Sequence, residues 1–325
     1  MKAIVQDVYG SADTLELRDD LDRPSPAPDE VLVRVHAAGV GPDVRHLMTG
    51  LPLMVRLGFG LRRPRNPVRG WDGAGRIESV GANVTGLRRG DAVYGHFEGS
   101  FAEYARARPA RIAPKPEALT FVQAAAVPVS GVTALRALHA RAGLRAGQRV
   151  LVIGASGGVG SLAVQLAVAH GADVVGVCGT GAAEFVRSLG AGDVIDYTHA
   201  EITDSGRRYD VVLDAAGNRP LSLLRRALTP DGTLVHIGGE GGSRWSGDAG
   251  TQLRMALAAR FARQNLLGLL AAVRREDLLT LNSLVEKGDV TPAVDSTYPL
   301  AEAPDAVRHL EKGRPRGKVV LVVTP

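Results

Sequence analysis

Residues 150–167 read "VLVIGASGGVGSLAVQLA", which is the strongest structural signal in the chain. An apolar run typical of a buried strand leads directly into Gly154, and an apolar helical pattern follows and ends at Gly171. Glycines allow a tight turn, bring the backbone close to a pyrophosphate, and let the helix pack near the strand. The helix N-terminus offers free N–H groups to the phosphates. We therefore predict a dinucleotide-phosphate loop made of Gly154, Ala155, Ser156, Gly157, Gly158, Val159 and Gly160.

Strands and helices alternate on the C-terminal side of this loop. Strand-like runs are expected at 173–178, 193–197, 209–217 and 232–239, with helical segments between them. This alternation predicts an α/β fold with a doubly wound parallel sheet of the Rossmann type.

The two ends of the chain have a different pattern. Roughly the first 120 residues have short alternating strand patterns between glycine and proline turns. Near the C-terminus, "GKVVLVV" (317–323) is a hydrophobic strand that needs a sheet to join, and we expect it to return to the first domain. The predicted domains are therefore 1–122 (β-rich), 123–272 (nucleotide-binding) and 273–325 (returning to the first).

Composition excludes several classes of protein. The net charge of +5 is small for 325 residues, and the arginines of 56–69 are not interleaved with stacking aromatic residues, so nucleic-acid binding is not expected. The single cysteine, Cys178, excludes an intramolecular disulfide and a zinc site of several cysteines. The start lacks a signal pattern, and the apolar runs are too short to span a membrane. We expect a cytoplasmic protein that acts on a small molecule.

The end of the second nucleotide-domain strand indicates which dinucleotide binds. NAD sites usually carry Asp or Glu there, on the ribose 2′-hydroxyl, but this chain has Cys178, Gly179 and Thr180. No carboxylate would repel a 2′-phosphate, and the Thr180 hydroxyl could donate a hydrogen bond to it. Arg187 is either a source of positive charge or a solvated helix residue. NADPH is therefore favoured over NADH.

Several motifs, in order along nearly the whole chain, carry a family resemblance: "GWDGAGRIESVGANVTGLRRGDAVYG" (70–95), "AAAVPVSGVTAL" (124–135), "GASGGVG" (154–160), "RSLGAGDVIDY" (187–197) and "GKVVLVV". With these motifs the chain resembles the medium-chain dehydrogenase/reductase superfamily, in particular its zinc-independent quinone oxidoreductase-like branch. The resemblance implies a GroES-like catalytic domain split around a Rossmann domain. It also implies NAD(P)-dependent hydride transfer in the cleft between them, and a homodimer.

The resemblance assigns residues to the cofactor. Gly154 to Gly160 would hold the pyrophosphate. Thr133, Gly238 and Gly239 would lie near the nicotinamide, and Ala215 would line the cleft. Cys178, Gly179, Thr180 and Tyr197 would surround the adenosine ribose and its phosphate, and Arg316 and Lys318 would reach the cofactor from the tail. Two alternatives stay open at this point: Tyr197 caps a loop, and Lys318 is a surface strand residue.

The positions that bind catalytic zinc in other members of the superfamily are altered here. The cysteine position falls at Gly41 and the histidine position at Trp71, and neither side chain offers a lone pair suited to zinc. Asp72 remains where zinc enzymes carry an acid, but one carboxylate makes no metal site. We therefore expect no metal, and chemistry that needs no Lewis acid.

A second departure concerns the substrate side. Quinone reductase relatives commonly read "VNPxD" where this chain reads "VGPDV" (40–44), so the asparagine is replaced by Gly41 and the acid stands one place early, at Asp43. Candidate catalytic residues are Asp43, His46 and Trp71, with Arg45 as a further polar candidate near His46. Trp71 is either a wall of the substrate cleft or a packed core residue. The histidine and arginine are also open to a structural role, which is the more common role of such residues in a loop.

The sequence predicts an NADPH-dependent oxidoreductase that transfers hydride to a quinone or an α,β-unsaturated carbonyl. A zinc-free alcohol or ketone dehydrogenase and a non-catalytic NADPH-binding sensor or structural protein remain alternatives. The loops 41–69 and 240–265 would shape the cleft, and the second of these either covers the cleft or builds a dimer contact.

Overall fold

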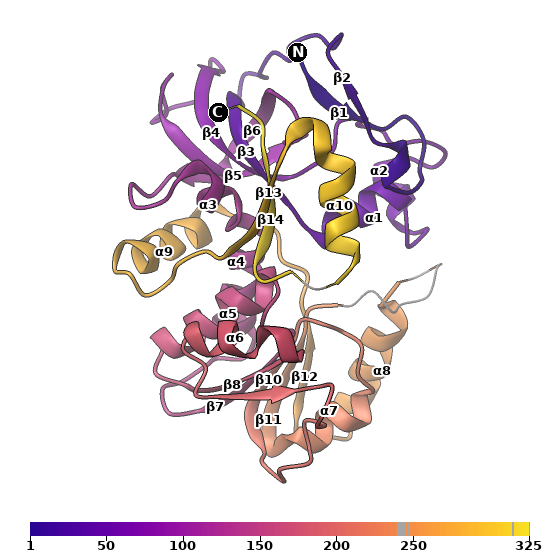
Figure 1. Cartoon of the computed structure of the whole chain (residues 1–325), viewed down its shortest axis with the longest axis vertical. Helices are drawn as coiled ribbons and strands as arrows, with labels where there is room; N and C mark the ends of the chain where they lie inside the picture. Colours follow the sequence, from indigo (N-terminus) through magenta and orange to yellow (C-terminus); the bar gives the residue numbers. More distant parts are fainter. Residues whose placement is uncertain (239–244, 246, 314, 325) are drawn as a thin grey trace. The chain divides into compact units, whose positions relative to one another are not determined.

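A computed structural model of the chain describes residues 1–238, 245, 247–313 and 315–324. Contacts divide it into two units (Figure 1). The first unit contains residues 1–132, 273–288 and 292–325, and the second contains 133–272 and 289–291. The first boundary lies further along the chain than residue 122, because α3 (Phe121–Ala125) packs against the strands β3 (Val31–Val40) and β4 (Asp72–Val80) of the first unit.

The second unit is built on a parallel sheet, as predicted. Its strand order is β12-β11-β10-β7-β8-β9, and every neighbouring pair is parallel. This is the usual order of a Rossmann fold, with its switch point between β7 and β10. The strands are β7 (Arg149–Ile153), β8 (Asp173–Cys178), β9 (Asp193–Asp196), β10 (Tyr209–Asp214), β11 (Leu228–His236) and β12 (Asn265–Gly268).

Apolar side chains hold this sheet to its helices. Strands buried on both faces read as nearly continuous hydrophobic runs, and Leu151, Val175 and Val212 belong to one buried cluster with residues of α7 and α8. The helical elements are α5 (Gly158–Ala169), a 3-10 turn η3 (Thr180–Ala182), α6 (Ala183–Ser188), α7 (Leu221–Ala227) and α8 (Ala249–Ala259). The strand β12 was not predicted, because its four residues, "NLLG", carry no alternation and no turn signal of their own.

The first unit contains a six-stranded sheet of order β13-β14-β3-β4-β5-β6, and β3 also pairs with β6. The remaining strands of this sheet are β5 (Ala92–Glu98), β6 (Tyr104–Pro114), β13 (Val294–Pro299) and β14 (Lys318–Val322). A separate hairpin pairs β1 (Ala3–Val5) with β2 (Glu16–Arg18). The helices are a 3-10 turn η1 (Ala12–Thr14), α1 (Pro42–Thr49), α2 (Val55–Phe59), α9 (Arg275–Glu286), a 3-10 turn η4 (Leu300–Glu302) and α10 (Ala303–Glu311).

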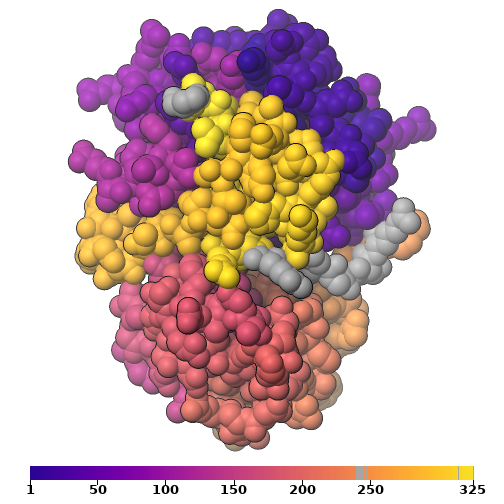
Figure 2. Space-filling view, in the orientation of Figure 1, coloured from indigo at the N-terminus to yellow at the C-terminus, as the bar shows by residue number. Residues whose placement is uncertain are grey.

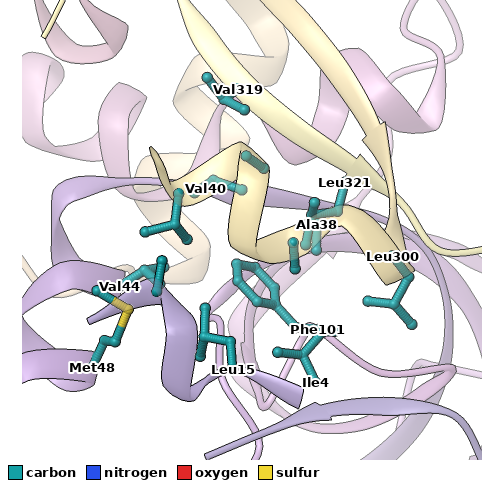
Figure 3. Close-up of a cluster of buried hydrophobic side chains, with 14 residues drawn as sticks. Ile4, Leu15, Ala38, Val40, Val44, Met48, Phe101, Leu300, Val319 and Leu321 are labelled. Carbon is teal, nitrogen blue, oxygen red and sulfur yellow. The ribbon is translucent and has the colours of Figure 1, made fainter. Parts of the chain in front are cut away.

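The C-terminal strand completes the first unit, as expected from its hydrophobicity. β14 runs antiparallel to β3 and parallel to β13. Val319 and Leu321 join a buried cluster with Ile4, Val40 and Phe101 (Figure 3). In Figure 2 the yellow C-terminal residues lie against indigo and purple residues of the N-terminal segment. The first unit is therefore assembled from both ends of the chain.

Residues 41–69 are partly helical rather than a loop. α1 begins at Pro42, which suits the first helical position because a helix start needs no N–H there. Its side chains Val44 and Met48 point into the same buried cluster (Figure 3). The helix α4 (Pro128–Leu135) crosses from the first unit to the second and continues as a short π-helix, Arg136–Arg141.

Candidate active site

The predicted phosphate loop begins where β7 ends. Gly154 has φ +80°, in the left-handed region that glycine adopts without strain. Its N–H and that of Ala155 donate to the carbonyl of Val177 on β8, over 3.1 and 3.0 Å. The turn is therefore anchored to the neighbouring strand before the helix starts.

The close approach of α5 to this turn requires Gly160. A Cβ at Gly160 would fall 2.0 Å from the carbonyl oxygen of Gly154, which no rotation of a side chain can relieve. The helix is preceded by Gly157, and no side chain caps its N-terminus. The twelve-residue helix therefore presents uncapped backbone N–H groups beside a turn with glycine at both of its ends, which fits a pyrophosphate.

Other predicted cofactor residues lie at the same carboxyl edge of the sheet. Ala215 follows β10, its N–H donates to the Ile153 carbonyl over 3.1 Å, and the backbone of residues 215–216 lies within 3.6 Å of a Cβ built on Gly154. Gly238 follows β11 with φ +109°. Gly239 lies outside the described residues. Thr133 is a nearly buried residue of α4.

The end of β8 brings together the residues predicted for the adenosine end. Tyr197 is 56% exposed, its N–H donates to the Cys178 carbonyl over 3.1 Å, and its hydroxyl lies 3.2 Å from a Cβ built on Gly179. The Cys178 side chain is buried, which raises the pKa of its thiol, so its thiol group is not presented to a ligand.

A carboxylate that sequence reasoning missed lies close to Thr180. Thr180 shares a 3.0 Å hydrogen bond with the hydroxyl of Thr198, which in turn donates to Asp196 over 2.7 Å. Hydrogen bonds from the side chains of Thr180 and Thr198 hold the pKa of Asp196 well below its ordinary value. Asp196 stands at the end of the third strand, β9, inside the motif "RSLGAGDVIDY", but that motif assigned it no role.

His236, the last residue of β11, was also missed, and it joins Asp214 at the end of β10 to Asp248 just before α8. Its Nδ1 lies 3.0 Å from Asp214 and its Nε2 lies 2.6 Å from Asp248. Burial disfavours the imidazolium, but the two carboxylates outweigh burial and raise the pKa of His236. Asp214 also accepts from the Gly217 N–H over 2.9 Å, so this group braces the turn after β10.

In the first unit, Lys318 is at the centre of a buried polar cluster. Its Nζ donates to Asp72 over 2.8 Å and to Ser130 over 3.3 Å, and only 4% of Lys318 is exposed. Burial disfavours its charge, yet Asp72 and Asp43 outweigh this and raise the pKa of Lys318. The alternative that Lys318 is a surface residue is therefore wrong. Asp72 also accepts from the Val129 N–H over 2.9 Å.

Asp43 faces the same cluster from the first turn of α1. A Cβ built on Gly41 would lie 2.3 Å from Asp43 Oδ1 and 2.9 Å from Lys318 Nζ. Burial, partly offset by the charge of Lys318 and reinforced by that of Asp72, raises the pKa of Asp43 to about 6. Perturbed carboxyl groups of this kind are typical of reaction sites.

The other two predicted catalytic residues have different surroundings. Trp71 lies between the rings of Phe59 and His96, at centroid distances of 5.7 and 5.3 Å. Burial lowers the pKa of His96 to about 4, so its ring is neutral near pH 7. His46 is exposed, and its Nδ1 lies 2.9 Å from the Leu51 carbonyl, a bond that fastens the end of α1 to the chain beyond it.

Comparison with known proteins identifies the family to which this architecture belongs. Residues 27–117 match the alcohol dehydrogenase GroES-like domain, and residues 189–321 match the zinc-binding dehydrogenase family. Over 99% of its length the chain is 34% identical to quinone oxidoreductase of Mus musculus, covering 98% of that protein. The chain belongs to the medium-chain dehydrogenase/reductase superfamily. Within it, this protein is quinone oxidoreductase-like and is an NAD(P)-dependent oxidoreductase.

Two further relatives support membership of this branch of the superfamily. NADPH-dependent alkenal/one oxidoreductase, chloroplastic, of Arabidopsis thaliana is 33% identical over all of this chain and 80% of that protein. The quinone oxidoreductase from Coxiella burnetii has a structure that superposes with a TM-score of 0.88 at 29% identity, covering 100% of this chain and 99% of that one. The fold expectation, a Rossmann sheet with a GroES-like domain, is thereby confirmed.

Proposed function

We propose that this dehydrogenase/reductase uses NADPH to reduce a quinone or an α,β-unsaturated carbonyl without a metal. The observation that carries the proposal is the Lys318 cluster. The ammonium lies 2.9 Å from a Cβ built on Gly41, where zinc relatives carry a cysteine ligand, and it is bonded to Asp72. Within the described part of the chain, no group of three or more His, Cys, Asp or Glu residues could hold a metal ion.

The chemistry of the residues favours this class of acceptor. When bound, the nicotinamide would supply a hydride, which is two electrons and one proton. Alcohol oxidation would need an alkoxide to be stabilised, a task that a Lewis-acid metal usually performs. Reduction of an electron-poor C=C bond needs weaker stabilisation. The negative charge that forms on hydride addition spreads to the carbonyl oxygen, where hydrogen-bond donors are sufficient to stabilise it.

We place the reacting carbonyl beside Gly41 and Asp43, as the resemblance implies. The neighbouring rings of Trp71, Phe59 and His96 offer an aromatic group suited to a planar acceptor. The phosphate loop would hold the cofactor through Gly154 to Gly160.

The preference for NADPH is also a proposal. One support is the end of β8, where Cys178, Gly179 and Thr180 place no carboxylate. The other is the Arabidopsis relative, whose name describes it as NADPH-dependent. Asp196 lies nearby, but its Oδ1 already accepts hydrogen bonds from the N–H and hydroxyl of Thr198, and its Oδ2 lies 3.2 Å from Nδ1 of His199. The exposed Arg187 of α6 would supply charge to a 2′-phosphate.

NADPH oxidation against a panel of quinones, cyclic enones, aldehydes and ketones tests the proposal, with NADH as the control cofactor. Turnover of a quinone or enone with NADPH at least about tenfold more efficient than with NADH is expected. Replacing Arg187 by Ala should weaken NADPH binding and leave NADH binding unchanged. Turnover of ketones or aldehydes alone would support the dehydrogenase alternative, and NADPH binding without any turnover would support a non-catalytic protein.

A homodimer and a cytoplasmic location are further proposals. α8 leaves Leu253 and Leu257 exposed at 62% and 50%, and Phe261 beyond it at 92%, with the spacing of one helix face. This face supports self-association, which sedimentation of the wild type and of Leu257→Glu would test. No described helix is long and apolar enough to cross a bilayer.

A further inference from the structure

Two glycines make room for Lys318 along β3 and just beyond it. A Cβ on Gly39 would lie 2.9 Å from the Cβ of Asp72 and 3.0 Å from the Cε of Lys318. At Gly41 the corresponding point lies 2.9 Å from the Lys318 ammonium. Positions 39 and 41 therefore border the same lysine side chain, Gly39 at its Cε and Gly41 at its charged end.

Gly41 is required for space and not for backbone conformation. Its φ of −131° and ψ of 172° are extended values that any residue adopts. Its Cβ, however, would meet Oδ1 of Asp43 at 2.3 Å. The Asp43 carboxylate therefore occupies the space into which a side chain at residue 41 would extend.

The two departures from the "VNPxD" pattern are thus one coupled change. The asparagine side chain is absent from position 41, and the acid has moved one place earlier so that its carboxylate fills the vacated position. The space beside position 41 and the Lys318 ammonium therefore holds a carboxyl group, which can titrate.

Charges on three elements surround this carboxyl group. Lys318 of β14 and His46 of α1 favour its ionised form, whereas Asp72 of β4 and burial favour its protonated form. Lys318 and Asp72 are themselves joined by the 2.8 Å hydrogen bond. Asp43 therefore sits beside an ion pair whose two members act on its proton in opposite directions.

We propose that Asp43 is the proton donor of the reduction, and that Lys318 and Asp72 are positioning residues that set how readily Asp43 releases its proton. This inference rests on the proposed function. In the step, a hydride adds to the β-carbon of the enone, the C=C π-bond breaks, and NADPH is oxidised to NADP⁺. The resulting enolate takes the proton from the Asp43 carboxyl group, whose carboxylate then regains a proton from water.

The pH dependence of kcat/KM with a cyclic enone is the first test. A general acid works only when protonated, so kcat/KM should fall as pH rises through the pKa of Asp43 in the free enzyme. Asp43→Asn preserves the size of the side chain and should remove this fall and lower kcat/KM at low pH by about 10²-fold or more. Asp29→Asn, which removes an exposed carboxylate of the same unit, is the matched control and should leave the profile unchanged.

The two positioning residues should shift the profile in opposite directions. Lys318→Met removes the positive charge and should move the fall to higher pH, whereas Asp72→Asn should move it to lower pH. Lys318→Arg keeps the charge and should leave the fall near its original position. Should Lys318→Met not fold, Asp72→Asn and Gly41→Ala keep the test intact, because a methyl group at 41 must displace the Asp43 carboxylate.

A measurement without turnover separates this inference from the proposed function. Carboxyl ¹³C NMR of the cofactor-free protein, with Asp43→Asn identifying the signal, should show the Asp43 titration moving up in Lys318→Met and down in Asp72→Asn. A wild-type profile and rate in Asp43→Asn, or a titration unmoved by either neighbour, would overturn the inference. Inactivity of the wild type with both quinones and enones would instead overturn the proposed function on which it rests.

Discussion

Lys318 donates a 2.8 Å hydrogen bond to Asp72 across 246 positions of sequence, inside the first unit. Both side chains are almost completely buried, at 5% and 1% exposure. A buried ion pair contributes little net stability against an apolar pair, but the loss of one partner leaves an uncompensated charge. The pair therefore couples the last strand of the chain to β4, and its members cannot be removed independently.

The first prediction concerns this pair. Lys318→Met should lower the free energy of unfolding by about 3 to 5 kcal/mol, because Asp72 is left buried without a counter-charge. The double variant Lys318→Met/Asp72→Asn should recover much of that loss, since an asparagine still accepts the Val129 N–H. Urea unfolding of the wild type, of Lys318→Met, of Asp72→Asn and of the double variant measures the coupling free energy between the two residues. Losses that simply add would show that the two residues are independent.

The second prediction tests the phosphate loop by paired glycine substitutions. Gly160→Ala should weaken NADPH binding at least about tenfold, about 1.4 kcal/mol, because its Cβ would fall 2.0 Å from the Gly154 carbonyl oxygen and push α5 away. A Cβ on Gly157 would lie 3.6 Å from the same Gly154 oxygen, which is an ordinary van der Waals contact, and the Gly157 φ of −78° suits alanine. Titration calorimetry of both variants should therefore show a small effect for Gly157→Ala, and equal effects would contradict this account of the loop.

A third prediction follows from His236. Its pKa is raised in the folded protein, so its interactions with Asp214 and Asp248 stabilise the fold fully below the ordinary histidine value of about 6.5 and lose that effect as pH rises through the higher folded value. The stability difference between wild type and His236→Gln should thus be largest in mild acid and shrink toward alkaline pH.

Urea unfolding of both proteins from about pH 5.5 to 8.5, a range that spans the usual histidine titration, measures this difference. Asp248→Asn should reduce it by removing one of the two carboxylates. A difference that is constant over the range would mean that the imidazole acts only as a neutral hydrogen-bonding group.

A fourth prediction concerns metal content. Because neither Gly41 nor Trp71 offers a zinc ligand, the purified protein should contain far less than one zinc per chain, and chelators should not affect its activity. Elemental analysis by mass spectrometry and assays with and without a chelator provide the measurement. Stoichiometric zinc whose removal abolishes turnover would contradict a metal-free reaction.

The nucleotide-binding architecture could be predicted from the sequence. Its signals are a buried strand, glycines at 154 and 160, and an apolar helix, which follow one another directly in the sequence. Each can be recognised from a few neighbouring residues, because backbone sterics and the helix N-terminus act over that short range. The hydrophobicity of 317–323 likewise predicted that the tail returns to the first sheet, as β14 does. The short strand β12 and the helices within 41–69 were not predicted, since packing rather than local pattern defines them.

The meeting of polar groups, by contrast, depends on how the chain folds in three dimensions. Lys318, Asp72 and Ser130 come from three distant segments, and His236, Asp214 and Asp248 from three others. No spacing in the sequence encodes these groupings, because strand pairing and burial bring the residues together. The same holds at Gly41 and Asp43: the sequence shows two departures from a motif, and the structure shows that one carboxylate fills the space the missing side chain leaves.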